Sequence, residues 1–391
     1  MKVSFYCQHV LGIGHFHRSL AICRALADRH QTTLILGGPP VAVDEGKVKT
    51  LLLPGLEMDP EFQNLVPCNP VLTLAEVKTR RREMLFAHLR EERPDIFVTE
   101  LYPFGRKAFR FELEPLFAAM QNGSLPKSLC CCSVRDILVE KVEGREKFEQ
   151  RAVETLNRYF DGVLVHADAD VITLGDTFSR LSAISIPIHY TGFVTRGDTE
   201  AGDYRIREER GLTATDKLIV ASIGGGNVGS ELLVAVVAAF DALPAEPPCH
   251  LQLFCGPYCD ESSYRQLKEA AQNSNSLHVD RFTDHFPAWL AAADLSISMA
   301  GYNTCMNLLQ AGIPALVYPY KQNREQRLRA ERIGTKAPIT VLTEDDFNPQ
   351  LLVGLISRQL AWPRAKPGVK LNGAAETVRQ LEAWFGKRMR Q

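Results

Sequence analysis

The chain is 391 residues long, which is enough for two or three domains of about 100–200 residues each. Apolar residues make up 45% of it and charged residues 23%, which excludes disorder, collagen and a coiled coil as descriptions of the whole chain. The 45 Lys and Arg residues are balanced by 46 Asp and Glu residues, so the basic excess of a nucleic-acid-binding protein is missing and no nucleic-acid partner is expected.

Short apolar runs alternate with helix-length segments through the first half of the chain. Residues 17–29, 76–93 and 145–159 carry apolar residues at helical spacing. The apolar runs that predict strands are residues 3–7, 32–36, 96–99, 129–133 and 162–165. Such alternation is typical of a parallel sheet with helices on both faces.

The alternation starts again after residues 195–216, a polar segment with three glycines that we interpret as a linker. The strands predicted beyond it are residues 218–222, 250–255, 277–279, 295–298 and 315–318. We therefore expect an α/β fold of two Rossmann-like domains, residues 1–195 and 196–372, whose parallel sheets face an interdomain cleft. In the remaining residues, 373–391, a helix predicted at 373–384 is a candidate to pack back on the first domain.

The ten cysteines form no recognisable disulfide or zinc pattern. They are scattered, and neither His nor a second Cys pair accompanies Cys255 and Cys259. We interpret them as reduced packing residues and expect a cytoplasmic protein without a metal site. The first strand follows Lys2 directly, and the longest apolar run has nine residues where a membrane span needs about 20, so neither a signal peptide nor a spanning helix is expected.

The loop after the first strand opens a helix and contains Gly12 and Gly14, followed by His15. The glycines permit a tight turn, and the free N–H groups of a helix start bind anions. His15 titrates near neutral pH, which suits a general base. A dinucleotide-binding Gly-x-Gly-x-x-Gly loop is disfavoured because residue 17 is His. The alternative is a glycine turn with structural histidines.

A second glycine-rich loop follows the strand at 218–222 and runs through residues 224–229. Its bare backbone, together with a helix dipole that contributes about 0.3–1 kcal/mol per favourable charge, predicts a diphosphate ligand. No Gly-Lys-Ser/Thr ends the loop, so it is not a Walker A motif. The alternative is a flexible turn without a ligand.

A third segment, residues 296–307, runs from a strand through small residues into a helix, for which Asn303 or Thr304 is a candidate cap. In open α/β sheets ligands bind beyond the carboxyl ends of strands, so this segment is expected at a ligand site.

Charged residues follow two strands of the first half: Glu100 and Arg106 after one, Arg135 and Asp136 after the next. A carboxylate and a guanidinium at the carboxyl end of a strand suit binding or base chemistry. The alternative for each is a local ion pair.

Residues 78–86 form a basic run that becomes apolar, within the helix predicted at 76–93. Through residues 78–93 the chain would make peripheral contact with an anionic membrane, at its inner face, or with an acceptor diphosphate. The alternative is a solvated helix face.

The chain resembles the GT-B glycosyltransferases of family 28 and the UDP-glycosyltransferases, a group that includes the murein-lipid N-acetylglucosaminyltransferases and the UDP-glucuronosyltransferases. The resemblance rests on the Gly-x-Gly-His opening at 12–15, on residues 298–307 with the Gly-Ile-Pro turn at 312–314, and on Glu325 and Gln326. Within the group it is nearest to uncharacterised bacterial glycosyltransferases, so the acceptor stays undefined.

The resemblance implies a donor site in the second domain and an acceptor site in the first. The glycine loop and residues 298–304 would hold the donor diphosphate, Arg281 and Phe282 would border the base, and Glu325 with its neighbour would bind the sugar. The implied donor-binding residues are Ser222, Gly224, Gly225, Gly226, Asn227, Arg281, Phe282, Ser298, Met299, Ala300, Gly301, Tyr302, Asn303, Thr304, Asn307, Glu325 and Gln326. The expected acceptor-binding residues are Gly12, Gly14, Arg18, Arg106 and Arg135.

One residue departs from the family pattern. Asn307 stands where family members usually carry a Glu that binds the ribose hydroxyls. An Asn side chain can hydrogen-bond a diol, but it cannot offer two charged oxygens.

These features predict an enzyme that moves a sugar from a nucleotide diphosphate sugar, by resemblance a UDP-sugar, to an acceptor hydroxyl. His15 is the first candidate for the base, followed by Glu100 and Asp136. Helix starts and glycine N–H groups would stabilise the leaving diphosphate, so neither a metal nor a further cofactor is expected. Inversion at the anomeric carbon is implied by the resemblance.

Two alternatives stay open on the sequence. An epimerase or hydrolase on the same scaffold would change or cleave a nucleotide sugar without an acceptor. A non-catalytic partner subunit would bind the nucleotide sugar without turnover, and Asn307 is the residue that favours it.

Overall fold

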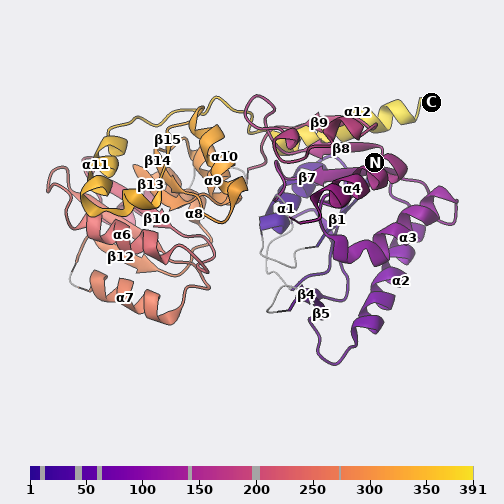
Figure 1. The fold of residues 1–391 in the computed structure, drawn as a ribbon, viewed down its shortest axis with the longest axis horizontal. Coiled ribbons are helices and arrows are strands. Elements are labelled where there is room, and N and C mark those ends of the chain that lie inside the picture. The colour runs from indigo at the N-terminus through magenta and orange to yellow at the C-terminus, as the bar shows by residue number, and fades with distance from the viewer. Residues whose placement is uncertain are drawn as a thin grey trace. The chain divides into compact units, whose positions relative to one another are not determined.

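The computed structural model describes residues 1–8, 14–39, 46–59, 64–139, 143–195, 203–272 and 274–390. The chain separates into two compact units, one made of Met1–Arg196 with Lys370–Gln391 and the other of Gly197–Val369. Each unit is a parallel sheet with helices packed on its faces (Figure 1). The predicted α/β fold with two Rossmann-like domains is confirmed for each unit taken by itself.

The first unit is built on a seven-stranded parallel sheet with the order β3-β2-β1-β6-β7-β8-β9. Its strands are β1 (Lys2–Cys7), β2 (Gln31–Leu36), β3 (Lys49–Leu52), β6 (Ile96–Glu100), β7 (Leu129–Val134), β8 (Gly162–Val165) and β9 (Ile188–Tyr190), beside a hairpin of β4 (Leu56–Met58) and β5 (Leu65–Pro67). Its helices are α1 (Gly14–Ala27), α2 (Leu74–Glu92), α3 (Arg110–Gln121), α4 (Arg145–Tyr159) and α12 (Gly373–Arg388). Short 3-10 turns are η1 (Lys107–Phe109), η2 (Leu174–Asp176) and η3 (Leu181–Ala183).

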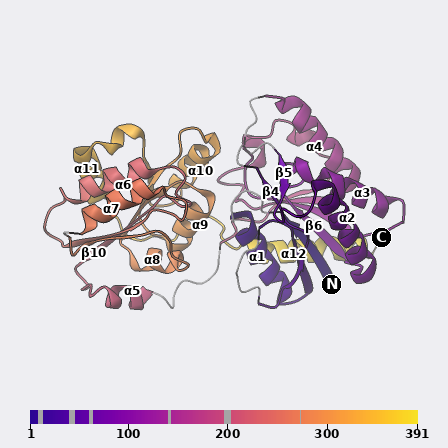
Figure 2. The same cartoon turned by 90° about the horizontal axis from the view of Figure 1, so that it is seen from below.

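Helices cover both faces of this sheet. In Figure 2, α1 and α12 lie together on one face, and α2, α3 and α4 lie on the other. Val378 and Leu381 of α12 are buried in the core that α1 forms with the strands. The returning chain is fixed by Asp168, whose carboxylate accepts a hydrogen bond from the backbone N–H of Lys370 at 2.9 Å. The C-terminal helix is therefore part of the first unit, which the chain rejoins at Lys370 rather than after residue 372.

The second unit is built on a six-stranded parallel sheet with the order β12-β11-β10-β13-β14-β15. Its strands are β10 (Lys217–Ser222), β11 (Cys249–Phe254), β12 (Leu277–Asp280), β13 (Leu295–Met299), β14 (Ala315–Tyr318) and β15 (Ile339–Val341). Its helices are α5 (Asp203–Glu209), α6 (Ser230–Phe240), α7 (Glu261–Ala271), α8 (Phe286–Ala292), α9 (Tyr302–Ala311), α10 (Arg324–Gly334) and α11 (Pro349–Leu360), with the turn η4 (Glu344–Phe347). Apolar side chains of α6 and α11 share one buried core with the strands.

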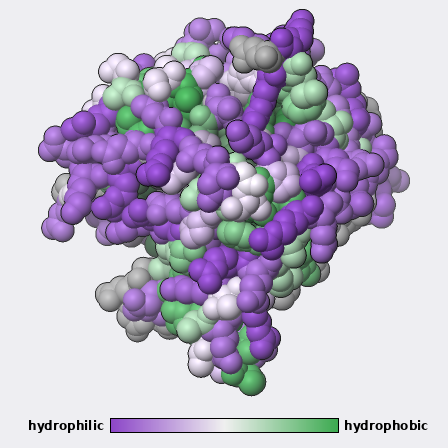
Figure 3. All heavy atoms as spheres, turned by 90° about the vertical axis from the view of Figure 1, so that its right-hand side faces the viewer, coloured by the Kyte–Doolittle hydropathy of each residue, from purple (hydrophilic) through white to green (hydrophobic). Residues whose placement is uncertain are grey.

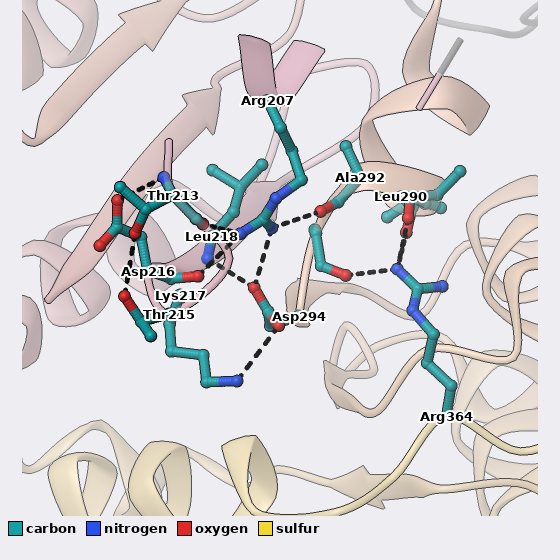
Figure 4. A network of polar contacts seen from close by, with 12 residues as sticks. Arg207, Thr213, Thr215, Asp216, Lys217, Leu218, Leu290, Ala292, Asp294 and Arg364 are labelled. Carbon is teal, nitrogen blue, oxygen red and sulfur yellow. Dashed lines mark hydrogen bonds and ion pairs between the residues drawn. The ribbon is translucent and has the colours of Figure 1, made fainter. Parts of the chain in front are cut away.

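The segment 195–216, interpreted from sequence as a linker, is partly helical, because α5 lies within it. Arg207 of α5 fixes it to the sheet: its guanidinium donates hydrogen bonds to the carbonyl oxygens of Ala292 at 3.0 Å and Asp216 at 2.8 Å. Figure 4 shows Arg207 and Lys217 converging on Asp294, which joins the start of β10 to the start of β13.

The winding of both sheets reverses beside their first strand. β1 lies between β2 and β6 in one sheet, and β10 lies between β11 and β13 in the other. Ligands of open α/β sheets bind at such reversals, beyond the carboxyl ends of the strands. The fold therefore directs attention to the loops after β1 and β6 and to those after β10 and β13.

The basic run at 78–86 is divided by burial. Arg80 and Arg82 are exposed, whereas the side chain of Arg81 is fully buried, with 0% exposure. Its guanidinium donates to the two carboxylate oxygens of Glu112 at 2.9 and 2.7 Å and to the amide oxygen of Gln8 at 2.7 Å. Arg81 thus ties α2 to α3 and β1, which corrects the interpretation of this run as one surface face. No helix among the described ranges is long and apolar enough to cross a membrane.

Replacing Arg81 tests this buried pair. Arg81→Met is expected to lower the free energy of unfolding by about 3–5 kcal/mol, because the Glu112 carboxylate would stay buried without its counter-charge. Arg82→Met, on the exposed face of the same helix, is the matched control and should stay within about 0.5 kcal/mol of the wild type. Denaturant unfolding followed by circular dichroism measures both variants. If Arg81→Met lost no more stability than Arg82→Met, the buried pair would not support the fold.

Candidate active site

In the second unit, the expected donor-binding segments follow strands at one edge of the sheet. Strand register pairs Ser222, at the end of β10, with Ser298 of β13, and Met299 with Tyr318 of β14. The glycine loop after β10 and the residues after β13 are therefore neighbours at the reversal of winding. Glu325 follows the next strand along the edge.

The glycine loop is packed in a defined conformation. Gly224, Gly226 and Gly229 have positive φ angles of 67°, 91° and 97°. A Cβ atom on Gly226 would lie 2.5 Å from the carbonyl oxygen of Cys255 and 2.6 Å from the backbone nitrogen of Cys259, so only glycine fits there. Open space surrounds the corresponding position on Gly224. One side of the loop is thus held by neighbouring backbone, and the other side is exposed.

Sequence reasoning missed the segment 255–259, which it considered only as part of a zinc site. The backbone N–H of Tyr258 donates to the carbonyl oxygen of Gly225 at 2.9 Å, and the Tyr258 side chain is 70% exposed beside that loop. Phe282, after β12, is also exposed, at 54%. The sequence signal that could have identified this segment is an aromatic residue, Tyr258, after the Gly256-Pro257 turn at the end of a strand. Two exposed aromatic side chains therefore follow the strands beyond the glycine loop.

Arg281 supports the same segment. Its guanidinium donates to the carbonyl oxygen of Cys259 at 2.8 Å, pairs with the carboxylate of Glu261, and lies 4.0 Å from the centre of the Tyr264 ring. These contacts hold the 255–259 segment against the glycine loop. Arg281 therefore has a structural role in addition to the expected one beside the nucleotide base.

Helix α9 starts without a side-chain cap, so the expectation that Asn303 or Thr304 caps it is wrong. The N-cap is Gly301, because the chain turns into the helix immediately after Ala300, whose N–H donates to the carbonyl oxygen of Tyr318 at 2.8 Å. The backbone N–H groups of Asn303 and Thr304 have no protein partner among the described residues. A helix start in this state can donate to an anion.

The remaining donor candidates are partly withdrawn from solvent. Asn307, within α9, is 7% exposed, and Glu325, at the start of α10, is 9% exposed. The amide oxygen of Gln326 accepts a hydrogen bond from the backbone N–H of Tyr320 at 3.1 Å, so it shapes the turn before α10. The amide nitrogen and one lone pair of the amide oxygen of Gln326 are left for other contacts.

At the reversal of the first sheet, four expected residues are in contact. Nδ1 of His15, in the first turn of α1, lies 2.6 Å from Oε1 of Glu100 at the end of β6. Arg18 donates to the same oxygen at 2.6 Å, and Nε of Arg106 lies 3.7 Å from the other oxygen. Helix α1 starts at Gly14 rather than at residue 17, as expected from sequence, and this places His15 on it.

Burial and charge set the protonation of this group. The side chain of Glu100 is 0% exposed and that of Arg18 is 2% exposed. Burial by itself raises the pKa of the Glu100 carboxyl, but His15 and the guanidinium groups of Arg106 and Arg18 outweigh it and hold the pKa well below its usual range. Burial lowers the pKa of His15 below 6.5, against the opposing effect of Glu100. Near neutral pH we therefore assign an ionised Glu100 beside a neutral imidazole.

This assignment fixes the tautomer of His15. An ionised carboxylate only accepts hydrogen bonds, so Nδ1 of His15 must carry the proton that it donates to Glu100. The other ring nitrogen, Nε2, then keeps its lone pair. A neutral histidine oriented by a carboxylate in this way can act as a general base.

A strained turn after β6 shapes the position of Arg106. Leu101 and Arg106 have positive φ angles of 64° and 55°. Such a conformation costs a residue with a side chain roughly 1–2 kcal/mol. Hydrogen bonds from the N–H of Leu101 to Ser133 at 2.8 Å and from the N–H of Gly105 to Leu101 at 2.9 Å hold the turn. Strain that the surrounding structure maintains is common at functional sites.

The other first-unit candidates behave differently. Arg135 donates through Nε to the buried carboxylate of Asp136 at 2.9 Å, which fits the ion-pair alternative for these two residues. Gly14 is the first residue of α1, and Gly12 lies outside the described residues.

No group of three or more His, Cys, Asp or Glu side chains is placed to hold a metal ion in the ranges that the structure describes. Asp168 and Asp170, which are spaced like the Asp-x-Asp motif that binds metals in other proteins, both contact the ammonium group of Lys370, at 3.3 and 3.4 Å. They fix the return of the chain to the first unit.

Residues 220–370 match the model of the glycosyltransferase family 28 C-terminal domain. Curated relatives are named UDP-N-acetylglucosamine–N-acetylmuramyl-(pentapeptide) pyrophosphoryl-undecaprenol N-acetylglucosamine transferase. The one from Natranaerobius thermophilus is 30% identical over 36% of this chain and 38% of its own length. The one from Corynebacterium diphtheriae is 28% identical over 46% of each chain. The chain spans less than half the length of the curated relatives it matches.

Solved structures match over nearly the whole chain. The glycotransferase of kitacinnamycin aligns with a TM-score of 0.64 at 17% identity, covering 98% of this chain and 99% of that one. MurG of Acinetobacter baumannii aligns with a TM-score of 0.59 at 16% identity, with the same coverage. These likenesses confirm the expected GT-B fold.

The close packing of the glycine loop predicts a graded effect of alanine. Both Gly224→Ala and Gly226→Ala place a side chain at positive φ, which costs roughly 1–2 kcal/mol. Only at Gly226 does the new Cβ also collide with backbone. Gly226→Ala should therefore lower the melting temperature by several degrees more than Gly224→Ala in differential scanning calorimetry. A larger loss at Gly224 would contradict the described packing.

Proposed function

We propose that this protein transfers a sugar from a nucleotide diphosphate sugar to the hydroxyl of an acceptor, because most of its second unit matches the model of the glycosyltransferase family 28 C-terminal domain. The observation that carries the proposal is the contact between His15 and the ionised Glu100 at the reversal of the first sheet. Free helix-start N–H groups at the corresponding reversal of the second sheet support it.

The second unit binds the donor in this proposal. The N–H groups of Asn303 and Thr304, together with the exposed backbone at 224–227, donate hydrogen bonds to the diphosphate. Tyr258 and Phe282 offer exposed rings on which a base can stack. Glu325 accepts hydrogen bonds from sugar hydroxyls. We favour UDP as the nucleotide because the named relatives use UDP-N-acetylglucosamine.

The first unit binds the acceptor and supplies the base. Nε2 of His15 takes the proton of the acceptor hydroxyl as the oxygen attacks the anomeric carbon. The imidazolium that forms is stabilised by Glu100, whose ionised state Arg18 helps to maintain. Negative charge on the leaving diphosphate is stabilised by the helix-start N–H groups, without a metal in this scheme. Attack opposite the leaving group inverts the anomeric carbon.

Peripheral membrane contact remains part of the proposal through the exposed cations Arg80 and Arg82 of α2. Figure 3 presents a face on which hydrophilic residues predominate and hydrophobic residues are interspersed. In this proposal the attraction is electrostatic, between the two exposed cations and an anionic leaflet.

Donor binding is the first test. UDP, GDP, dTDP and their sugars are added to the intact protein, and the melting temperature is measured. A ligand that binds only the folded state adds about 2.7 kcal/mol of stability at 100 times its Kd, so we expect a clear rise with UDP and UDP-sugars. The Gly226→Ala variant, with its distorted loop, should show a much smaller rise. No rise with any nucleotide would contradict the proposed donor site.

The same panel separates transfer from its alternatives. Conversion or cleavage of a UDP-sugar at full rate without an acceptor would indicate an epimerase or a hydrolase. Binding without turnover across hydroxyl acceptors would indicate a partner subunit.

Replacing His15 tests the base. His15→Ala should lower kcat by roughly 10²–10⁴-fold while donor binding is retained, because only proton removal is lost. His17→Ala, on the same helix, is the matched control. A near-normal rate for His15→Ala would remove His15 from this role.

The pH profile gives an independent check. Because burial lowers the pKa of His15, the active neutral form should persist below pH 6.5 and be lost as the pH falls through the lowered pKa. In Glu100→Gln the opposing effect of the carboxylate is gone, so the acid limb of the kcat profile should move to still lower pH. A limb that moves upward would argue against this pair.

A further inference from the structure

We infer that the first unit binds a phosphate-bearing ligand in a cavity that the proposed transfer reaction does not use. The cavity measures about 340 Å³ and lies between the loop after β6 and the start of α4. This volume falls within the usual size of small-molecule sites, about 300–1,000 Å³. Its lining combines an apolar wall with several cations, and these two features determine the shape and the charge of the ligand that fits.

The cations of the lining are mostly unpaired. Among the described residues, the side chains of Lys107, Lys147 and Arg151 form no hydrogen bond or ion pair. The fourth cation, Arg110, pairs with Glu114 at 2.6 Å. Glu143 is the one carboxylate among the described residues of the lining. Three free cations around one cavity therefore leave it positively charged, in a chain whose net charge is -1.

Neighbouring cations outside the cavity do find carboxylates. Arg145, in the first turn of α4, pairs with Glu149 at 2.7 Å, and Arg180 pairs with Glu146 at 2.9 Å. Carboxylates are thus available along this helix, and in these two pairs they bind cations that do not line the cavity. Among the described residues, Lys107, Lys147 and Arg151 have no such partner, and an anionic ligand in the cavity would supply one.

An aromatic wall gives the cavity a fixed shape. Tyr102 is 2% exposed, and its ring stacks on Phe117 with centres 6.2 Å apart and an interplanar angle of 18°. Pro103 and Phe148 extend the apolar lining. A preformed apolar wall beside free cations suits a ligand with a flat or apolar body and a phosphate group, rather than a simple counter-ion.

The cavity belongs to the first unit, whereas the proposed donor loops belong to the second. Its residues also differ from those that contact His15. The inference therefore does not depend on the proposed function, and either can fail alone.

The test uses the intact protein and inorganic pyrophosphate as the probe. The double variant Lys147→Gln/Arg151→Gln removes two free cations that are not buried, so the fold should persist. The matched control, Lys127→Gln/Arg158→Gln, makes the same change of charge at two exposed residues of the same unit that do not line the cavity. Calorimetric titration should show at least a tenfold weaker Kd for the cavity variant and less than a twofold change for the control. Pyrophosphate bound at the donor loops would contribute equally to both.

A second arm identifies the source of the phosphate. Co-sedimentation is measured with phosphatidylcholine vesicles, with and without phosphatidic acid, whose headgroup is a phosphomonoester. Vesicle binding that needs phosphatidic acid and is lost in the cavity variant indicates a lipid headgroup. Pyrophosphate binding without vesicle binding indicates a free phosphorylated molecule. Wild-type behaviour of the cavity variant in both assays, or an equal loss in the control, would overturn the inference.

Discussion

In a parallel sheet every strand ends at the same edge, and each following helix leaves that edge on one face or the other. Where two neighbouring strands send their helices to opposite faces, the loops separate and leave a crevice. This happens between β1 and β6 in one unit and between β10 and β13 in the other. At the first lie a histidine and a carboxylate in contact, which we propose as the groups that take the acceptor proton. The second holds glycines and a bare helix start, which suit negative charge.

The contact between Glu100 and its neighbours would be a poor way to stabilise a fold. A buried ion pair gains little over apolar packing, because its charges must leave water. Two residues of the same loop, Leu101 and Arg106, also adopt left-handed backbone. Both unfavourable contributions, the buried charges and the left-handed backbone, occur at or beside the carboxylate that contacts His15. This pattern is expected where function rather than packing selects the residues.

The long buried strands and the main helices were predictable because their apolar periodicity is strong. The strand β9 spans only Ile188–Tyr190, too few residues for alternation to be recognised. The contact between His15 and Glu100 joins residues 85 positions apart, so only the strand order, which sequence does not reveal, brings them together. The close packing of Gly226 against residues 255–259 likewise depends on the strand order. Arg81 was misjudged because charge in a helix usually means solvent, and its buried partner Glu112 lies 31 residues away.

The return of the chain at Lys370 makes the first unit discontinuous in sequence. Domains tend to fold as units, amino-terminal parts first, while the ribosome still extends the chain. Here that order is interrupted, because α12, which buries Val378 and Leu381 in the core beside α1, is synthesised only after the whole second unit. Until then the part of the first core that Val378 and Leu381 fill is incomplete, although α1 already packs on β1 and β2. The first unit therefore cannot complete its core until the ribosome has passed the second.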